Sequence, residues 1–206
     1  EDGGSGWEKF GSMAKSAGKL AVEGIKTVTV GAAGAVAGVT TAFLATAEGT
    51  RETRTEMAKL ETGFTSAGHS AEAGLQTYRE LFAVLGDAGR ATEASAHLAL
   101  LASTEEDLQK WTEICTGVYA TFGDSLPIEG LTEAANETAK TGSLTGVLAD
   151  ALNWAGVNED DFQASLDGCS SEQERQALIT ETLTGLYQEQ AETFRQVNAD
   201  VIKANE

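Results

Sequence analysis

Short stripes of apolar residues, spaced three and four positions apart, recur along the sequence from residue 66 to residue 206. This spacing is typical of helices that bury one face. Glycines or polar clusters follow most of the stripes and would end the helices there. The chain contains a single proline and no alternating run of apolar and polar residues long enough for a strand. The sequence therefore predicts an all-α fold, with a multi-helix bundle over residues 66–206.

One stripe is especially regular, and we expect its members to anchor the core of the bundle. They are Leu108, Trp111, Cys115, Val118 and Phe122. We expect Trp154 and Tyr119 to be core anchors as well. The last stripe is the longest, and it predicts one helix with an apolar face from Ile179 to Val201 that includes Phe194 and Val197.

Serine residues stand in front of three predicted helices. Ser103 with Glu106, and Ser171 with Glu174, have the spacing of a capping box. In that motif the serine side chain accepts a hydrogen bond from the backbone amide three residues on. The carboxylate of the glutamate at that position accepts a hydrogen bond from the backbone amide of the serine. Ser143 is expected to cap the helix that follows it. Local side chains thus predict where these helices begin.

Residues 27–47 form a run of 21 residues without a charged side chain. A helix needs roughly 20 residues to span a bilayer, but this run is mostly Ala, Thr, Val and Gly, so its hydrophobicity is marginal for insertion. Small residues spaced along one helix face let two helix backbones approach closely. Here the predicted contact strip consists of Gly31, Gly34, Gly38 and Ala42. Two interpretations stay open: a buried or self-associating helix, and a membrane-inserting helix.

The segments on either side of this run complete a predicted long helical arm. Residues 1–26 have apolar residues at helical spacing and four lysines off that stripe. They predict a basic amphipathic helix, which packs on a partner helix or lies on an anionic membrane. Residues 48–65 are predicted as a polar helical connector to the bundle. Because the chain begins with Glu1 rather than Met, we expect it to be a piece of a longer protein.

Negative charge is concentrated after the apolar run. The formal net charge is −18, and residues 48–206 carry 28 acidic residues against ten Lys and Arg, while residues 1–47 carry four of each. Proteins bind nucleic acid chiefly by neutralising phosphates with basic side chains. The sequence therefore predicts no nucleic-acid binding.

Motifs for catalysis or metal binding are missing from the sequence. His69 and His97 lack metal-binding spacing, and Cys115 and Cys169 are isolated cysteines, typical of a reducing compartment. The sequence has no phosphate-binding glycine loop and no nucleophile elbow. The acidic residues 159–161 lack the alternating oxygen ligands of a calcium loop. We therefore expect no enzymatic activity, no metal and no cofactor.

Three segments of the sequence resemble phage tail tape measure proteins, which are also known as minor tail proteins. The first is the lysine-dotted opening, WEKFGSMAKSAGKLAVEGIKTVTVGAAGAVAG (7–38). The two more distinctive segments are FGDSLPIEGLTEAANETAKTGSLTGVLADALNWAG (122–156) and CSSEQERQALITETLTGLYQEQAETFRQVNADVIKANE (169–206). Together they cover most of the chain.

The resemblance implies a long helical protein of the virion, held in the tail lumen, whose length sets the number of tail rings and which leaves before or with the DNA at infection. It implies other copies of itself, tail tube and tail tip proteins, and tail assembly chaperones as partners. It implies the host cytoplasm as its location during assembly and the host membrane as a further contact during ejection. Because helix-ending residues interrupt residues 66–206 every 12–20 positions, we expect an N-terminal region of such a protein that folds compactly outside the tube, rather than its extended shaft.

Two other classes of function stay open. A membrane-active, pore-forming protein could use residues 27–47 as its insertion helix, although the sequence shows no secretion signal. A cytosolic helical scaffold would account for the bundle, but it leaves the uncharged run unexplained.

Overall fold

The computed structural model describes residues 51–205, in which the regular secondary structure is helical and no strand occurs. The all-α prediction is confirmed for this part of the chain. The predicted arm over residues 1–47, with its contact strip, lies outside the described residues. The elements are α3 (Arg51–Ala67), α4 (Ala71–Leu85), α5 (Ala88–Leu101), α6 (Glu105–Phe122), the 3-10 turn η2 (Gly123–Ser125), α7 (Ile128–Thr141), α8 (Gly146–Trp154), α9 (Glu159–Asp167), α10 (Glu172–Val197) and α11 (Ala199–Asn205).

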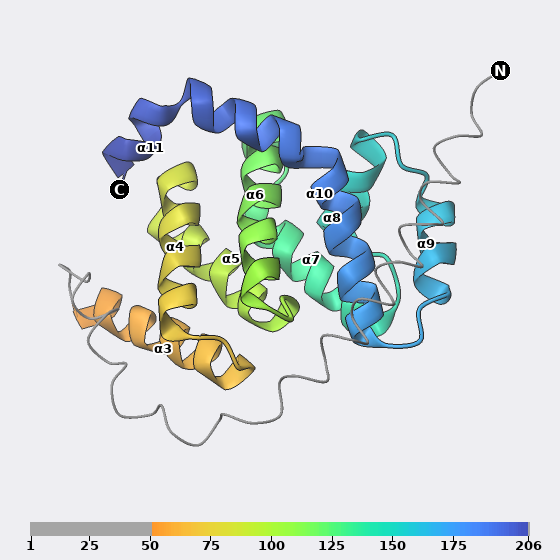
Figure 1. The fold of residues 1–206 in the computed structure, drawn as a ribbon, viewed down its shortest axis with the longest axis horizontal. Helices are drawn as coiled ribbons and strands as arrows, with labels where there is room; N and C mark the ends of the chain where they lie inside the picture. Colours follow the sequence, from red (N-terminus) through yellow and green to blue (C-terminus); the bar gives the residue numbers. More distant parts are fainter. Residues whose placement is uncertain (1–50, 206) are drawn as a thin grey trace.

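Helices α6 and α10 form the central pair, and their contact is the most extensive between any two described helices (Figure 1). Helix α5 packs against α3, α4 and α7, while α7 also contacts α8 and α10. Helix α9 borders α8 at one end of the molecule. At the other end, α11 turns back from α10 and lies against α4 (Figure 1). The C-terminal end of the long helix α10 extends past the helices that bury its middle.

Helix α3 contributes to the same core as the later helices. Its apolar residues Met57, Leu60 and Phe64 are buried. The Phe64 ring lies over Gly74 of α4, where an added Cβ would come 2.6 Å from the ring. The core therefore begins before residue 66, inside the segment that the sequence predicted as a polar connector. One narrow apolar edge is enough to dock α3, because its other faces stay in water.

Four of the five predicted core anchors are buried in α6: Leu108, Trp111, Cys115 and Val118. The fifth, Phe122, ends the helix and is only partly buried. Its ring packs edge-on against Tyr187 and Trp154, with centroids 6.0 and 5.2 Å away. The prediction of a buried Trp154 is wrong, because this side chain is 51% exposed. Trp154 is the last residue of the short helix α8 and covers Phe122 with one side while the other faces water.

The apolar face predicted for the last helix stays in the core only for part of its length. Ile179 and Leu183 are fully buried, but Val197 is 78% exposed and Val201 is 57% exposed. The prediction for these two valines is wrong for two reasons. The helix breaks at Asn198, and its last turns extend past the helices that cover its middle.

Side-chain caps define most of the helix starts. Five helices begin after a residue whose side chain accepts a hydrogen bond from the amide three residues on; these residues are Ser70, Asp87, Thr104, Asn158 and Ser171. The predicted cap at Ser171 is confirmed, with Glu174 N at 3.2 Å. The prediction that Ser103 caps α6 is wrong by one residue, because the cap is Thr104. Ser103 Oγ instead donates to Gln176 Oε1 of α10 at 2.9 Å. The helix expected after Ser143 starts later, with Thr145 at its N-cap position.

Candidate functional site

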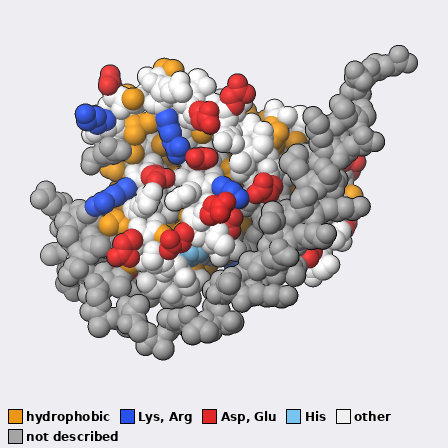
Figure 2. Space-filling view, in the orientation of Figure 1, with side chains coloured by type: hydrophobic (Ala, Val, Ile, Leu, Met, Phe, Trp, Pro, Cys, Tyr) orange, Lys and Arg blue, Asp and Glu red, His pale blue; other side chains and the backbone are white. Residues whose placement is uncertain are grey.

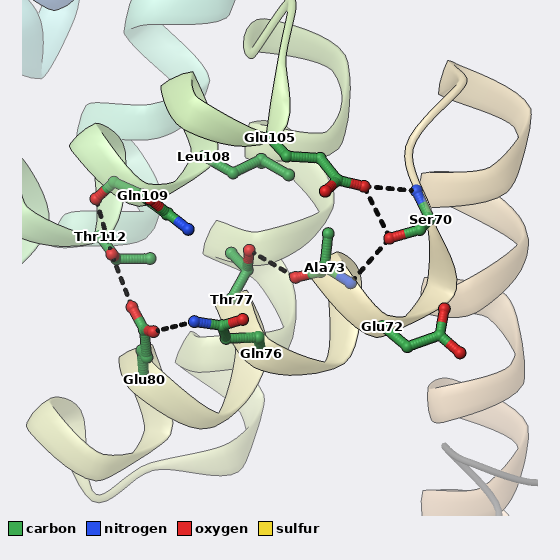
Figure 3. Close-up of a pocket in the computed structure, with 10 residues that line it drawn as sticks. All are labelled: Ser70, Glu72, Ala73, Gln76, Thr77, Glu80, Glu105, Leu108, Gln109 and Thr112. Atoms are coloured by element: carbon green, nitrogen blue, oxygen red, sulfur yellow. Dashed lines mark hydrogen bonds between the residues drawn. The ribbon is translucent and has the colours of Figure 1, made fainter.

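A small polar pocket lies between α4 and α6 (Figure 3). Its volume is about 130 Å³. Polar side chains make up most of its wall, and three of them are carboxylates. The lining residues are Ser70, Glu72, Ala73, Gln76, Thr77, Glu80, Glu105, Leu108, Gln109 and Thr112.

The start of each helix contributes to one end of this pocket. Ser70 Oγ accepts from the amide of Ala73 at 3.1 Å and so caps α4. The same hydroxyl donates to Glu105 Oε1 at 2.7 Å, and the backbone amide of Ser70 lies 3.3 Å from that oxygen. Glu105 is the first residue of α6, where a negative charge is favoured by the helix dipole. One carboxylate thus joins the first turns of two helices (Figure 3).

Glu80 and Thr112 join the helices at the other end of the pocket. Glu80 Oε1 accepts from Gln76 Nε2 at 2.8 Å within α4. The Thr112 hydroxyl of α6 lies 2.7 Å from Glu80 Oε2 and 2.8 Å from the carbonyl oxygen of Gln109. Both neighbours are acceptors, so the single hydroxyl proton serves one of them at a time. The Thr112 hydroxyl therefore donates either to Glu80 or to the Gln109 carbonyl, but not to both at once.

A wider groove continues from the pocket towards the C-terminal helices. It encloses about 520 Å³ between α4, α6, the end of α10 and α11. Its apolar lining includes Ala83, Val84 and Ile202. Its charged lining consists of Glu80, Glu113, Arg195 and Lys203. Glu113 of α6 and Arg195 of α10 form a long ion pair, with 3.7 Å between Oε1 and Nη1.

The polar side chains of pocket and groove hold neighbouring helices together. Glu80 and Glu105 accept hydrogen bonds from neutral donors, Glu113 forms its ion pair with Arg195, and no histidine or cysteine lines either hollow. Within residues 51–205 no group of His, Cys, Asp and Glu has the arrangement to bind a metal ion. His69 is used structurally: its Nε2–H donates to the Ala102 carbonyl at 3.1 Å, and its ring packs on Phe64. Every helix in the same range is too short or too polar to cross a bilayer.

The two cysteines differ in access, and this difference predicts their reactivity. Burial raises the pKa of the Cys115 thiol well above its usual range, and burial together with Glu174 raises the pKa of Cys169. Cys115 is inside the core, whereas Cys169 is only partly covered. Thiolate is the reactive form of cysteine.

We therefore expect iodoacetamide at pH 8 to modify Cys169 slowly and Cys115 not at all in the folded protein. Mass spectrometry of the labelled peptides measures this directly. Both thiols should react after unfolding in guanidinium chloride, which serves as the control. Equal labelling of the two thiols in the native protein would place Cys115 outside the core.

The sequence-predicted site residues fall into two sets. The contact strip of Gly31, Gly34, Gly38 and Ala42 lies outside the described residues. Four of the five α6 anchors are buried in one core, and the fifth, Phe122, packs against it. Sequence reasoning missed the polar residues between α4 and α6, since Ser70 and Glu105 are 35 positions apart and no local pattern links them.

It also missed Gly117, where the backbones of α6 and α10 approach so closely that α10 leaves no room for a Cβ. A glycine within a regular apolar stripe, between Cys115 and Val118, was the available indication of such an approach.

Comparison of the chain with models of protein families, with characterised proteins and with solved structures finds no match.

Proposed function

We propose that the chain is a segment of a phage tail tape measure protein, and that residues 51–205 are a compact structural module of it without catalytic activity. The observation that carries the proposal is the sequence resemblance of residues 7–38, 122–156 and 169–206 to that family. In this proposal the module's partners are other copies, tail tube and tail tip proteins, and tail assembly chaperones. Its locations are the tail lumen and, during assembly, the host cytoplasm.

The character of the described helices supports a structural role. Segment 122–156 supplies α7 and α8, and segment 169–206 supplies α10 and α11, so both distinctive segments belong to one packed unit. The pocket in that unit holds carboxylates and hydroxyls that bond to each other between α4 and α6. A compact unit of short helices fits a region beside the extended shaft of a tape measure protein better than the shaft itself.

The reading frame that encodes the chain provides the first test. We expect a parent protein of many hundreds of residues, encoded beside genes for tail tube proteins. In-frame deletions within the remaining helical part of that parent should then shorten the tails in proportion to the residues removed, measured by electron microscopy. A short, complete frame without neighbouring tail genes, or tails of unchanged length, would contradict the proposal.

The charge of the chain predicts that it does not bind DNA. Figure 2 shows acidic side chains spread over one face, with Lys and Arg interspersed among them. With a net charge of −18 the surface repels phosphates. We expect no shift of a labelled 30-base-pair duplex in fluorescence anisotropy at 150 mM salt. A salt-sensitive rise in anisotropy at micromolar protein would show that the chain has a phosphate-binding surface.

The uncharged run over residues 27–47 favours a second candidate, a membrane-active protein. Replacing Gly34 and Gly38 with Leu separates membrane insertion from helix association. The change raises hydrophobicity, so partitioning into liposomes should rise, and it blocks close approach of helix backbones, so cross-linked oligomers should decrease. If partitioning and oligomers both rise, the glycine strip is not the contact face.

A further inference from the structure

A groove of about 520 Å³ lies between α4, α6, the end of α10 and α11. Its volume is typical of sites that bind ligands, which enclose roughly 300–1,000 Å³. Ala83 and Val84 of α4 and Ala199 and Ile202 of α11 supply its apolar lining. Figure 2 shows hydrophobic side chains gathered where α11 lies against α4. The surrounding helices thus leave an apolar space that no side chain of residues 51–205 fills.

The N-terminal part of the same chain carries a pattern that suits this space. From residue 7 to residue 28, apolar residues recur three and four positions apart, beginning with Trp7, Phe10 and Ala14. An amphipathic helix binds in an apolar groove through residues at this spacing, and large aromatic side chains are the strongest anchors. Trp7 and Phe10 are such side chains, one helical turn apart. Residues 7–28 therefore have the pattern of a helix that docks in a groove.

Charge favours contact between this segment and the bundle. Residues 7–28 contain four lysines and two glutamates, whereas residues 48–206 carry 28 acidic residues against ten Lys and Arg. The groove itself is acidic on α4 and α6 and basic on α10 and α11, and the segment has Glu8 and Lys9 between its two aromatic residues. Opposite charges steer association and suppress wrong partners. The acidic bundle therefore attracts residues 7–28 and repels the bundle of a second copy.

The connection to the bundle is long enough for the segment to reach the groove. Residues 29–50 join it to α3, which begins at Arg51 and packs on α4. Burial and the nearby Glu56 carboxylate raise the pKa of Tyr78, so the start of α3 lies beside α4, which lines the groove. A connection of 22 residues spans about 33 Å as a helix and about 70 Å when extended. Both lengths exceed the width of one helix, about 10–12 Å.

We propose that residues 7–28 bind as a helix in the groove between α4, α6 and α11 of the same chain. Trp7 and Phe10 enter the groove against Val84 and Ile202, and the lysines face the acidic surface around it. The connection makes the binding intramolecular, with an effective concentration on the order of millimolar, so a weak contact is sufficient. While docked, the segment is withheld from every other partner. This inference does not depend on the proposed role in a phage tail.

Fluorine NMR of the full chain tests the proposal. A chain labelled with 5-fluorotryptophan contains three fluorinated residues, and Trp7→Phe identifies the signal of Trp7. A nitroxide spin label is attached to Arg79→Cys, an exposed position next to Glu80 of the groove, in a Cys169→Ser background where Cys115 stays buried. This label should broaden the Trp7 signal beyond detection. The same label on Asp160→Cys of α9, at the other end of the molecule, should leave the Trp7 signal unchanged (Figure 1).

Three variants show whether the groove holds the segment. Val84→Gln in the groove and Phe10→Ser in the segment should each restore the Trp7 signal when the label is at residue 79. Val201→Gln is the matched control, because it removes an exposed valine of α11 that is outside the groove lining, and the signal should stay broadened. Phe10→Ser changes no residue of the bundle, so it tests the contact even if Val84→Gln disturbs the fold.

A mixture of two chains distinguishes binding within one chain from binding to a second copy. Spin-labelled chain without fluorine is mixed with an equal amount of fluorinated chain without the spin label, and the Trp7 signal should stay sharp. Broadening in the mixture would mean that a second copy fills the groove, which overturns the proposal. The proposal is also overturned if the label at residue 79 leaves Trp7 sharp, if the label at residue 160 broadens it equally, or if Phe10→Ser leaves it broadened.

Discussion

Replacing Trp111 with alanine should lower the free energy of unfolding by about 3–5 kcal/mol, as the loss of a large core aromatic does. The Trp111 side chain is completely buried at the centre of α6. Its Nε1 donates to Thr180 Oγ1 of α10 at 3.0 Å, so the side chain joins the central helix pair by packing and by a hydrogen bond. Chemical denaturation followed by circular dichroism measures the change.

Trp154→Ala is the matched control, because it removes the same side chain from a half-exposed position on α8. We expect a loss well below that of Trp111→Ala, limited to the contact with Phe122. Equal losses for the two variants would mean that α6 does not bury Trp111. A further variant, Thr180→Val, leaves the indole N–H without its partner and should cost about 1–3 kcal/mol.

Replacing Gly117 with alanine should destabilise the bundle by about 3 kcal/mol, the upper end of the cost of inserting a methyl group into a packed core. An added Cβ would lie 2.1 Å from the carbonyl oxygen of Tyr187 and 2.9 Å from its carbonyl carbon. These are backbone atoms of α10, so no side-chain rotation relieves the clash. The two central helices would have to move apart, and this would loosen the Trp111–Thr180 contact as well.

Gly185→Ala on α10 is the control for Gly117→Ala. It is also a glycine in the interior of a central helix, but nothing lies within 4 Å of an added Cβ. Alanine is the better helix former, so this variant should be more stable by about 0.5–1 kcal/mol. If Gly117→Ala also stabilised the protein, α6 and α10 would not approach as closely as the structure places them.

Local properties of the sequence predicted much of the helical organisation. The cap at Ser171 depends on residues within one turn of it. Gly86, one of the glycines that follow an apolar stripe, ends α4 with a φ of 66°. The regular stripe on α6 identified Trp111 and Cys115 because helical spacing alone places such residues on one face. The one-residue error at Ser103 has a similar local origin, because Thr104 is an equally good cap and leaves Ser103 free to bond to α10.

The pocket between α4 and α6 could not be predicted in the same way. Glu80 and Thr112 are 32 positions apart, and each is an ordinary polar residue on a helix surface until the two helices dock. Their hydrogen bond follows from the docking angle, which depends on packing throughout the core. The close approach at Gly117 has the same cause, since it needs Tyr187 of a helix far along the chain.

Local sequence patterns were enough to predict that residues 51–205 are helical, that α10 begins after Ser171, and which face of α6 is apolar. Which of the apolar faces are covered depends on how the helices pack. Val197 and Val201 belong to a correct helical stripe, yet they stay exposed because no neighbouring helix covers them, and Trp154 is covered on one side only, by Phe122. Helix formation is governed by residues up to four positions apart, whereas burial depends on partners distant in sequence.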